Sequence, residues 1–438
     1  MDIEGYARKH IDDPELERKL AERIMEFKDI SEEGAVRLAR AVIVEVQNAY
    51  SRTDWLLDYY RSNVSMGKFG VGSRGTGDFY VHSKIAEMCG DAVVSSKDLD
   101  DAGVVRAGDY YISVAIDGIH SRLSEFPFIA GFHVTRAAMR DVLVMGSRPV
   151  ALFSDIHVAD DGDVSKIFDH LAGITAVSEL TDVPLVAGST LRIGGDMVIG
   201  ERMTGAVGCV GVSKHITPRR NAEAGDVIIL TEGAGGGTVA TAAIYYGMHE
   251  VVEETVNLDF IFAAMALIES DVVGSIHAMS DVTNGGIRGD AEEISKTSGT
   301  ALYFDTEKIR GLINGRVLQM LEKLEIDFMG VSIDSLMVIC PESLAEDVLG
   351  IIRKAGVNAD VVGWVETGQG AFAVEDGETK PLKPRFRESA YTPIKKLVGE
   401  EYPEDFEEMK ARVDLAFHKA VEKRKRVVER LRRKVPSS

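Results

Sequence analysis

The chain has 438 residues, of which 45% are hydrophobic and 27% are charged, and its formal net charge is −20. This length exceeds what one ordinary hydrophobic core organises, so we expect two domains with extensions. The negative charge excludes a nucleic-acid-binding surface spread over the whole chain, and an anionic ligand would need local positive charge or a metal ion.

The sequence carries no signal of membrane insertion or secretion. The longest apolar runs, such as Val227–Leu230, are far too short to cross a bilayer. The N-terminus is acidic and lacks the basic-then-apolar layout of a signal peptide. Cys89, Cys209 and Cys340 give neither a disulfide framework nor a zinc pattern. We therefore expect a cytoplasmic protein with no membrane partner.

Residues 1–62 carry helical periodicity without any chemistry-bearing motif. Apolar residues recur at spacings of three and four from Leu16 to Phe27, and again over Ala35–Tyr50. Ser31 precedes the second run and is a candidate N-cap. The pattern predicts a helical N-terminal extension that packs on the body or on a second subunit.

A glycine-rich stretch spans residues 67–77 and has the sequence Gly-Lys-Phe-Gly-Val-Gly-Ser-Arg-Gly-Thr-Gly. Backbone amides in such a stretch can approach a phosphate. The stretch lacks the Gly-Lys-Ser/Thr ending of a Walker loop, and no predicted strand precedes it. On the segment alone, a flexible linker is favoured over a phosphate loop.

The middle of the chain alternates strand-like and helix-like patterns in two units. The first unit is predicted to contain strands at Tyr110–Ile116, Pro184–Ala187 and Met203–Val212, helices at His133–Met145 and Val164–Leu180, and a turn at residues 188–190. The second unit opens near Asn221 with a short buried strand. It continues with predicted helices at Leu258–Ser270, Arg288–Ser298 and Arg316–Leu324 and strands at Val331–Ile339 and Asp360–Val365.

Four short segments each place one aspartate beside small residues, at Asp91, Asp117, Asp141 and Asp281. Carboxylates that gather repel one another unless a divalent cation lies between them, and oxygen-only ligands suit Mg²⁺ bridged to nucleotide phosphates. No His-Glu-x-x-His, Gly-x-Ser-x-Gly or Cys-x-x-Cys motif points to another catalytic class. The pattern predicts a magnesium-nucleotide enzyme.

Two of these aspartates have turn or loop alternatives. Asp117-Gly118 between apolar runs is equally typical of a type I′ hairpin turn. Asp91 follows Gly90 and is also compatible with a plain loop before a strand at residues 92–94.

The other two aspartates lie in helical surroundings. Asp141 sits among apolar residues, where a carboxylate needs a partner, and an ion pair with Arg136 or Arg140 is the alternative to a metal. Asp281 precedes a helix, so it serves either as a cap or as a metal ligand. In the second case the helix N-terminus at Gly285 and Gly286 would meet phosphate.

Together, in this order, the segments resemble the aminoimidazole ribonucleotide (AIR) synthetase superfamily, over about residues 68–370. This family includes selenophosphate synthetase, a hydrogenase-maturation dehydratase and thiamine-monophosphate kinase. The most specific matches are Ala115–His120 followed by Ala137–Pro149, which resemble the family's Thr-Asp-Gly strand end and its Asp-Leu-x-x-Met-Gly-Ala-x-Pro helix. Ser280–Ile287 and Gly225-Asp226 are similar to segments of the second domain.

The resemblance implies an α+β fold with an N-terminal, β-rich domain that dimerises and binds ATP near the subunit interface, and a C-terminal α/β domain. The expected units are a helical extension over 1–62, the two domains over 63–215 and 216–375, and a helical basic tail over 376–438. We expect a homodimer that uses ATP and Mg²⁺.

The resemblance also implies the site. It assigns Asp91, Asp117, Asp141 and Asp281 as Mg²⁺ ligands, with Asp117 central to catalysis. The stretch 67–77 would be a mobile lid, and Lys68 or Arg74 would supply positive charge. The expected nucleotide contacts are Gly72, Gly75, Gly77, Gly118, Asn284, Gly285 and Gly286.

The sequence departs from the family pattern at several points. The family's first motif usually has two consecutive aspartates, whereas Asp91 stands alone, and Arg140 occupies a position where asparagine or serine is typical. The stretch 67–77 has no cysteine, unlike the selenophosphate branch. The leading hypothesis is ATP- and Mg²⁺-dependent phosphoryl transfer to, or activation of, an unidentified small molecule. The alternative is a non-catalytic nucleotide-binding assembly protein that keeps the fold.

The segment His418–Lys434 is strongly basic in an otherwise acidic chain. A solvated terminal helix is the favoured interpretation, because charge runs usually face water. Contact with RNA or an acidic partner is the alternative.

Overall fold

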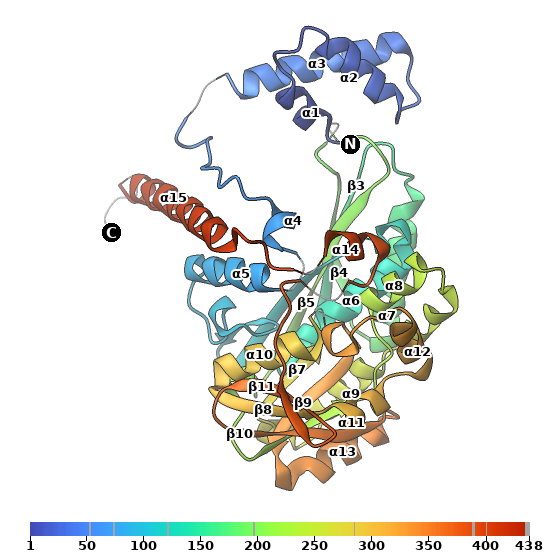
Figure 1. Ribbon diagram of the computed structural model, residues 1–438, viewed down its shortest axis with the longest axis vertical. Helices are drawn as coiled ribbons and strands as arrows, with labels where there is room; N and C mark the ends of the chain where they lie inside the picture. The colour runs from blue at the N-terminus through green and yellow to red at the C-terminus, as the bar shows by residue number, and fades with distance from the viewer. Residues whose placement is uncertain are drawn as a thin grey trace.

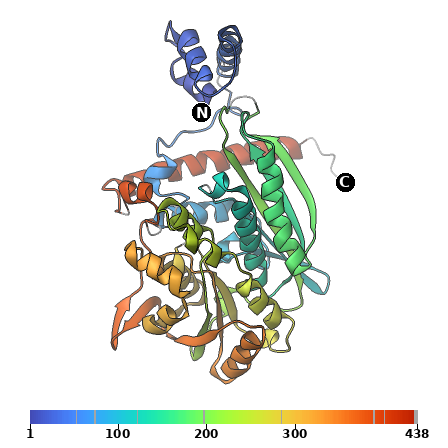
Figure 2. The same cartoon turned by 90° about the vertical axis from the view of Figure 1, so that its right-hand side faces the viewer.

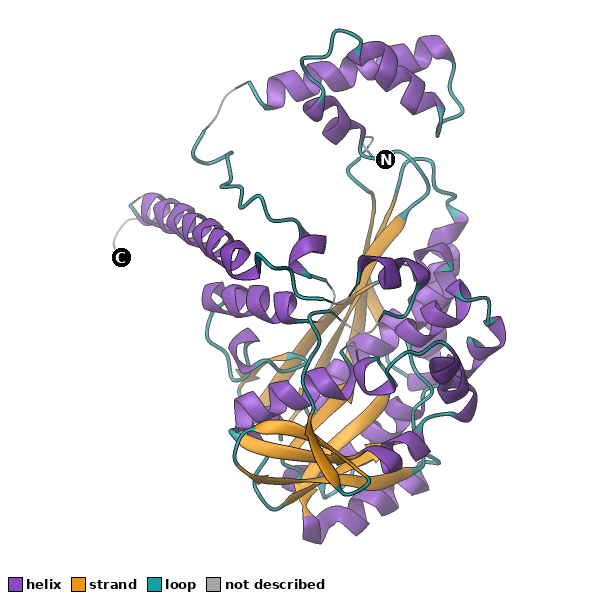
Figure 3. Ribbon diagram, viewed as in Figure 1, coloured by secondary structure: helices purple, strands orange, loops and turns teal. Residues whose placement is uncertain are grey.

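The computed structural model describes residues 1–51, 54–72, 75–120, 122–195, 198–283, 285–387, 390–399 and 401–433. Two mixed α/β units, each built on one sheet, form the body, and a small helical bundle at the N-terminus stands beside it (Figure 1, Figure 3). The expected two-domain α+β fold with helical extensions is confirmed. Within the part of the chain described, no helix is long and apolar enough to cross a bilayer.

The first domain is a five-stranded sheet in the order β1-β2-β5-β3-β4. Helices α6 (Pro127–Val144) and α7 (Ser165–Thr181) pack against it. The strands are β1 (Gly103–Ala107), β2 (Tyr110–Gly118), β3 (Arg148–Val158), β4 (Leu185–Arg192) and β5 (Met203–Ser213). Strands β3 and β4 are parallel and joined through α7, while the other pairs are antiparallel.

In this domain the turn alternative for Asp117-Gly118 and the turn predicted at residues 188–190 are both wrong. Asp117 and Gly118 form the end of β2 and pair with Val207 and Ala206 of β5, so they are not a hairpin turn. Residues 188–190 lie inside β4 and pair with β3, because the strand continues to Arg192 through the glycine.

The second domain is a seven-stranded sheet in the order β12-β11-β8-β10-β6-β9-β7. Its strands are β6 (Asp226–Thr231), β7 (Ala278–Val282), β8 (Thr300–Asp305), β9 (Ser335–Pro341), β10 (Ala359–Thr367), β11 (Gly370–Glu375) and β12 (Glu378–Pro381). Its helices are α8 (Gly237–Tyr245), α9 (Asp259–Ile268), α10 (Gly286–Ser298), α11 (Thr306–Leu312), α12 (Gly315–Lys323) and α13 (Ala345–Lys354). The three predicted helices correspond to α9, α10 and α12.

Helix α6 lies between the two sheets and belongs to the core of both domains. Apart from its first turn, nearly every residue is buried. The helix contacts β2, β3 and β5 on one side and β7, α8 and α9 on the other. One continuous apolar cluster therefore joins residues from both sheets. A polar side chain on this helix must find its partner in one of the two domains.

The N-terminal extension has its own small core. It consists of α1 (Ile3–Lys9), α2 (Leu16–Met25) and α3 (Glu32–Ala49). The side chain of Ser31 accepts a hydrogen bond from the backbone N–H of Gly34, which confirms the predicted N-cap. Lys28 forms ion pairs with Asp160 and Asp161, which follow β3. The bundle thus packs on the tip of the first domain (Figure 1).

The glycine-rich stretch and the C-terminal tail are packed together. Helices α4 (Met66–Phe69) and α5 (Thr76–Met88) flank the stretch, and α14 (Pro393–Val398) and α15 (Phe406–Arg432) form the tail. Phe69, Phe386, Phe406 and Met409 form a separate buried cluster. Helix α15 lies along α5, with Tyr80 donating a hydrogen bond to Asp414 (Figure 1, Figure 2). The described parts of the stretch, residues 67–72 and 75–77, are therefore not an unstructured linker.

Candidate functional site

A cavity of about 600 Å³ lies between the two domains. It brings together Asp117, Asp141 and Asp281, which are far apart in the sequence, along with Gly72 and Gly118. The end of β2, the inner face of α6, the end of β7, the start of α8 and the C-terminal tail all contribute to its lining. Three of the four predicted acidic residues thus share one cavity.

Each of the three aspartates is positioned by a different element. Asp117 is half-buried in β2, one residue before the strand ends. Asp141 is half-buried in the last turn of α6. Asp281 is 1% exposed in β7, which is buried along its whole length. A helix and two strands from two domains therefore each place a carboxylate in the lining of the same cavity.

Asp281 is a buried carboxylate with one unsatisfied oxygen. Its Oδ1 atom accepts a hydrogen bond of 3.4 Å from the Thr283 hydroxyl, while Oδ2 accepts none from the described residues. Its nearest cation is Arg140, whose Nε atom lies 3.5 Å from Oδ2. The capping alternative is wrong, because α10 has Gly285 at its N-cap position and no side-chain cap.

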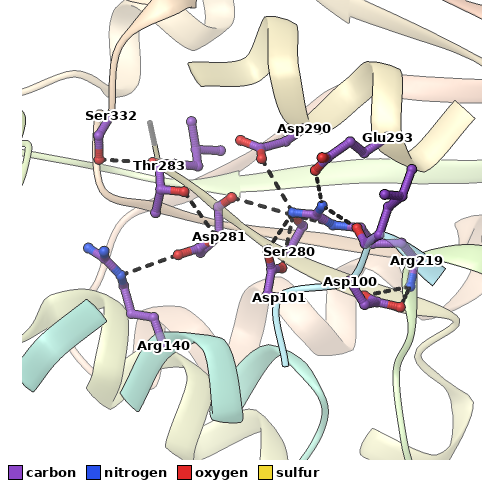
Figure 4. A network of polar contacts seen from close by, with 12 residues as sticks. Asp100, Asp101, Arg140, Arg219, Ser280, Asp281, Thr283, Asp290, Glu293 and Ser332 are labelled. Atoms are coloured by element: carbon purple, nitrogen blue, oxygen red, sulfur yellow. Dashed lines mark hydrogen bonds and ion pairs between the residues drawn. The ribbon is translucent and has the colours of Figure 1, made fainter. Parts of the chain in front are cut away.

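Asp91 does not reach the cavity. Its side chain is 95% exposed and forms an ion pair of 2.8 Å with Lys97. The structure instead places two consecutive aspartates, Asp100 and Asp101, beside Asp281 (Figure 4). This pair has the form of the family's first motif and directly precedes β1, a signal that the sequence analysis missed by matching Gly90-Asp91 ten residues too early.

Asp101 carries the electrostatic signature of a crowded acidic site. Burial raises the pKa of its carboxyl well above the usual range, and the carboxylates of Asp281 and Asp141 add to the rise, while Arg219 opposes it. Burial likewise raises the pKa of Asp100 to about 6, against the lowering effect of Arg219. A cation placed among these groups would stabilise their ionised forms.

Arg219 neutralises part of this cluster. Its guanidinium is 1% exposed and donates to Asp101 at 2.6 Å, to Asp290 at 3.3 Å and to Glu293. It also donates to the Ser280 hydroxyl at 2.7 Å (Figure 4). One arginine therefore ties the aspartate pair before β1 to α10 and β7 of the second domain.

The two arginines of α6 share a carboxylate that the sequence analysis did not foresee. Arg136 and Arg140 both form ion pairs with Asp334, which precedes β9 and has a φ of +60°. Arg136 also donates to His133 Nδ1 at 3.3 Å and to the Thr255 carbonyl at 2.7 Å. This buried network fastens α6 to the second domain.

Another part of the cavity is lined by basic and aromatic side chains instead of carboxylates. These are His120, Arg122, Tyr391 and Lys395. His120 Nε2 lies 2.9 Å from the Tyr391 hydroxyl, and Lys395 Nζ lies 4.0 Å from the centre of the Tyr391 ring. Burial, with help from Arg387 and Arg122, lowers the pKa of Lys395 to about 7. This part is cationic, whereas the part near Asp281 is acidic.

The remaining predicted site residues are placed as follows. Lys68 forms an ion pair of 2.8 Å with Asp405 on the surface and is not part of the cavity lining. Gly75, Gly77, Gly285 and Gly286 do not line the cavity either. A Cβ on Gly77 would come within 1.7 Å of the Phe69 carbonyl oxygen, so this glycine serves packing. Arg74 and Asn284 lie outside the described residues.

Comparison with known proteins bears on this geometry. Residues 99–213 match the model of the AIR synthase related protein, N-terminal domain, and residues 223–375 match that of its C-terminal domain. The uncharacterized protein MJ1416 of Methanocaldococcus jannaschii is 54% identical, with 99% of this chain and 98% of the relative aligned. The chain belongs to the AIR synthase-related family.

Similarity to other proteins is more distant. The selenide, water dikinase of Pseudomonas straminea is 26% identical over 50% of this chain and 60% of its own length. Among solved structures, a HypE–HypF complex matches with a TM-score of 0.58 and 18% identity over 69% of this chain and 99% of that chain. Hydrogenase maturation protein HypE in complex with ATP matches with a TM-score of 0.53 and 17% identity over 62% and 84%. These structural matches support the fold assignment.

The residues present fit a magnesium ion better than any softer metal. The nearby side chains offer carboxylate oxygens, and the Oδ2 atom of Asp281 is buried without a hydrogen bond from the described residues. Among the residues that the structure describes, no three His, Cys, Asp or Glu side chains already converge into a metal-binding group. Such open spacing is compatible with a cation that also takes oxygen ligands from a phosphate.

Proposed function

We propose that this protein binds ATP with Mg²⁺ in the interdomain cavity and transfers a phosphoryl group to, or activates, a small molecule. One observation carries the proposal. Asp117, Asp141 and Asp281 line one cavity, next to Asp101, whose side chain is 12% exposed, although the four residues come from four separate segments. Asp281 is the buried member of this group, and its Oδ2 atom accepts no hydrogen bond from the described residues, so a cation bound there would stabilise its charge. The ATP-bound HypE structure and the selenide, water dikinase are relatives in keeping with nucleotide use.

The candidate ligands for the ion are Asp101, Asp117, Asp141 and Asp281. A bound Mg²⁺ would neutralise charge on the phosphate oxygens during transfer. The chain itself would hold the nucleotide between α6 and β7, and the tail segment at Tyr391 would help to keep water out of the cavity. The acceptor would be an oxygen, sulfur or selenium nucleophile, and a reaction related to that of selenophosphate synthetase is the form we favour.

Calorimetric titration of ATP with and without Mg²⁺ tests this proposal. Asp117→Asn and Asp281→Asn should weaken Mg-ATP binding at least tenfold, or about 1.4 kcal/mol. Asp91→Asn is the matched control, since Asp91 is a surface aspartate paired with Lys97, and it should bind as the parent does. Unchanged binding in both cavity variants would refute the metal assignment.

A second candidate function is nucleotide binding without catalysis, in an assembly or regulatory role. The observation that favours it is the position of Arg140, whose Nε atom lies 3.5 Å from Asp281 Oδ2. The guanidinium there would take the place of a metal ion at this carboxylate. Tight Mg-ATP binding without any release of ADP during long incubation would favour this candidate. Slow background hydrolysis that is lost in Asp117→Asn would favour the enzyme.

We also propose that the protein forms a homodimer through the first sheet. The face of this sheet opposite α6 and α7 exposes Tyr110, Val114 and Ile116 from β2 and Leu191 from β4. An apolar face of this kind is typical of an interface. Ile116→Glu should lower the mass measured by light scattering, whereas Leu57→Glu in the N-terminal connection should leave it unchanged.

The cytoplasmic location and the role of the basic tail stay predictions. Several basic residues of the tail contact other parts of the protein: Lys419 pairs with Glu422, Arg424 donates to the Met88 carbonyl and Arg426 stacks over Trp55. Side chains engaged in this way are not available to RNA, so the contacts favour a terminal helix without an RNA partner. Retention of RNA by the parent protein, lost on deleting residues 418–438, would overturn it.

A further inference from the structure

Arg219 lies in the connection between the two matched domains. It opens the short helix η3 (Arg219–Asn221), between the family match that ends at residue 213 and the one that begins at residue 223. Its side chain is 1% exposed. An arginine buried this completely needs partners for its N–H donors, and those partners must come from the segments packed around it.

The guanidinium of Arg219 is shared between the two domains. In the first domain it donates to Asp101 Oδ1 at 2.6 Å and to the Leu99 carbonyl at 2.9 Å. In the second domain its Nη2 and Nε atoms donate to the Ser280 hydroxyl, at 2.7 and 3.1 Å. Its Nη1 atom also pairs with Glu293 of α10. One planar fork therefore holds three segments together (Figure 4).

Ser280 connects this contact to the neighbouring Asp281. Its hydroxyl oxygen accepts from Arg219, and its own proton has two acceptors in reach, Asp101 Oδ2 at 3.5 Å and the Asp281 carbonyl at 3.4 Å. Asp101 therefore gives one carboxylate oxygen to the arginine and turns the other towards the serine. Asp101 and Asp281 are candidate ligands of one ion and belong to different domains, so their separation depends on how these domains are held together.

We propose that Arg219 is a positioning residue for the metal site. By holding Asp101 against Ser280, it fixes the separation of the Asp101 and Asp281 carboxylates and makes the site selective for Mg²⁺ over Ca²⁺. Mg²⁺ requires near-ideal octahedral geometry at about 2.0–2.1 Å, whereas Ca²⁺ accepts flexible arrangements at about 2.3–2.6 Å. This role deepens the Mg-ATP function proposed above and rests on it for its catalytic meaning.

Arg219→Lys in the full-length protein tests this role. Lysine keeps a positive charge beside Asp101 and Glu293, but its single ammonium cannot hold a carboxylate and the Ser280 hydroxyl in the fixed geometry of a fork. Mg²⁺ and Ca²⁺ are titrated separately by calorimetry, first without nucleotide and then at constant ATP. The affinity for Mg²⁺ should fall about tenfold, and that for Ca²⁺ should change less than about twofold.

Arg220→Lys is the matched control. Arg220 is the next residue, pairs with Asp98 at 2.7 Å and donates to the Val93 carbonyl at 2.9 Å. None of its hydrogen bonds within the described chain reaches Asp101 or Ser280. Both metal affinities should therefore stay as in the parent.

Ser280→Ala is a second variant, which leaves Arg219 in place and removes the hydroxyl between it and Asp101. It should lower the affinity for Mg²⁺ several-fold, again with little change for Ca²⁺. Near-UV circular dichroism shows whether each variant is folded. If Arg219→Lys does not fold, Ser280→Ala decides the question, and an unchanged Mg²⁺ affinity in it would overturn the positioning role.

The positioning role is also overturned if Arg219→Lys loses affinity for both ions equally, since Arg219 would then only support the fold, or if it loses none. Its failure is distinguishable from failure of the nucleotide proposal. A parent protein that prefers Mg²⁺ but binds no ATP, with the preference lost in Arg219→Lys, would keep the positioning role and refute the nucleotide function. Mg-dependent ATP binding with the same ratio of Mg²⁺ to Ca²⁺ affinity in parent and variant would do the reverse.

Discussion

The Nε atom of Arg140 lies 3.5 Å from the Oδ2 atom of Asp281, in the acidic part of the interdomain cavity. Both side chains are almost completely buried, at 8% and 2% exposure. The same carboxylate oxygen is a candidate ligand for Mg²⁺. A metal ion bound at this oxygen, as we propose, would therefore compete with the fixed guanidinium for one negative charge.

Replacing Arg140 by asparagine, the residue type common at this position in the family, should raise the affinity for Mg²⁺ in the presence of ATP. Removing a nearby positive charge is worth on the order of 1–2 kcal/mol in a partly screened site, or about tenfold in affinity. Titration of Mg²⁺ at constant ATP by calorimetry measures the change. Arg148→Asn, at an exposed arginine paired with Glu269, should behave as the parent. An unchanged Mg²⁺ requirement in Arg140→Asn would contradict the competition.

Arg219 and its neighbour Arg220 provide a matched pair for stability. Arg219→Met should lower the free energy of unfolding by about 3–5 kcal/mol, because it leaves Asp101, Asp290 and Glu293 buried together without their shared cation. The Arg220 side chain is 34% exposed and pairs with Asp98, so Arg220→Met should lose about 1 kcal/mol or less. Urea denaturation followed by circular dichroism gives both values. Equal losses would show that the buried cluster does not depend on Arg219.

His133 should make the protein sensitive to acid. Burial, with the charges of Arg140 and His120, lowers the pKa of His133 from 6.5 to about 3. The unfolded chain therefore binds a proton that the folded chain refuses, and the free energy of unfolding falls as the pH drops from 6.5 towards 3. Above this window the contribution is constant.

The variant His133→Gln removes this titration. It should flatten the acid-side slope of stability by roughly 1 kcal/mol per pH unit. Thermal unfolding measured across pH 4–7 provides the comparison, and His249→Gln, at an exposed histidine, is the control. A slope in His133→Gln as steep as in the parent would show that other groups dominate acid unfolding.

The glycine-rich stretch should tolerate alanine at one glycine and not at another. In Gly77→Ala the new Cβ would meet the Phe69 carbonyl oxygen at 1.7 Å, so the backbone must move, at about 1–3 kcal/mol or more. Gly67→Ala meets no atom within 4 Å and lies in helix α4, where alanine is favourable. Limited proteolysis should cut near residues 64–72 faster in Gly77→Ala alone. Equal digestion of the two variants would mean that the stretch is not packed as described.

Local patterns in the sequence foretold a large part of this architecture. The β-rich run at Tyr110–Ile116 and the helical spacing from His133 correspond to β2 and α6. Helix α6 begins earlier, at Pro127, because proline suits the first turn of a helix, a signal the periodicity did not include. The order of the family-like motifs along the chain correctly predicted that Asp117, Asp141 and Asp281 share one cavity.

Contacts between distant segments could not be predicted. The doublet Asp100-Asp101 was visible in the sequence, but its role depends on Arg219, which lies more than a hundred residues away. Lys68 was expected at the phosphates, yet its partner is Asp405 in the tail. Lys395 lines the cavity because the chain passes along the cavity again after the second domain. The periodicity of the sequence does not predict that path.

Helix α6 has a consequence for how the molecule can be divided. The family match changes from one domain to the other between residues 213 and 223, but the apolar cluster around α6 draws members from both sides of that boundary. If the chain were cut there, the first half would expose the α6 flank that meets β7 and α9, and the second half would lose the surface on which those elements rest. We therefore expect the two family-matched segments to unfold together and not as separate units.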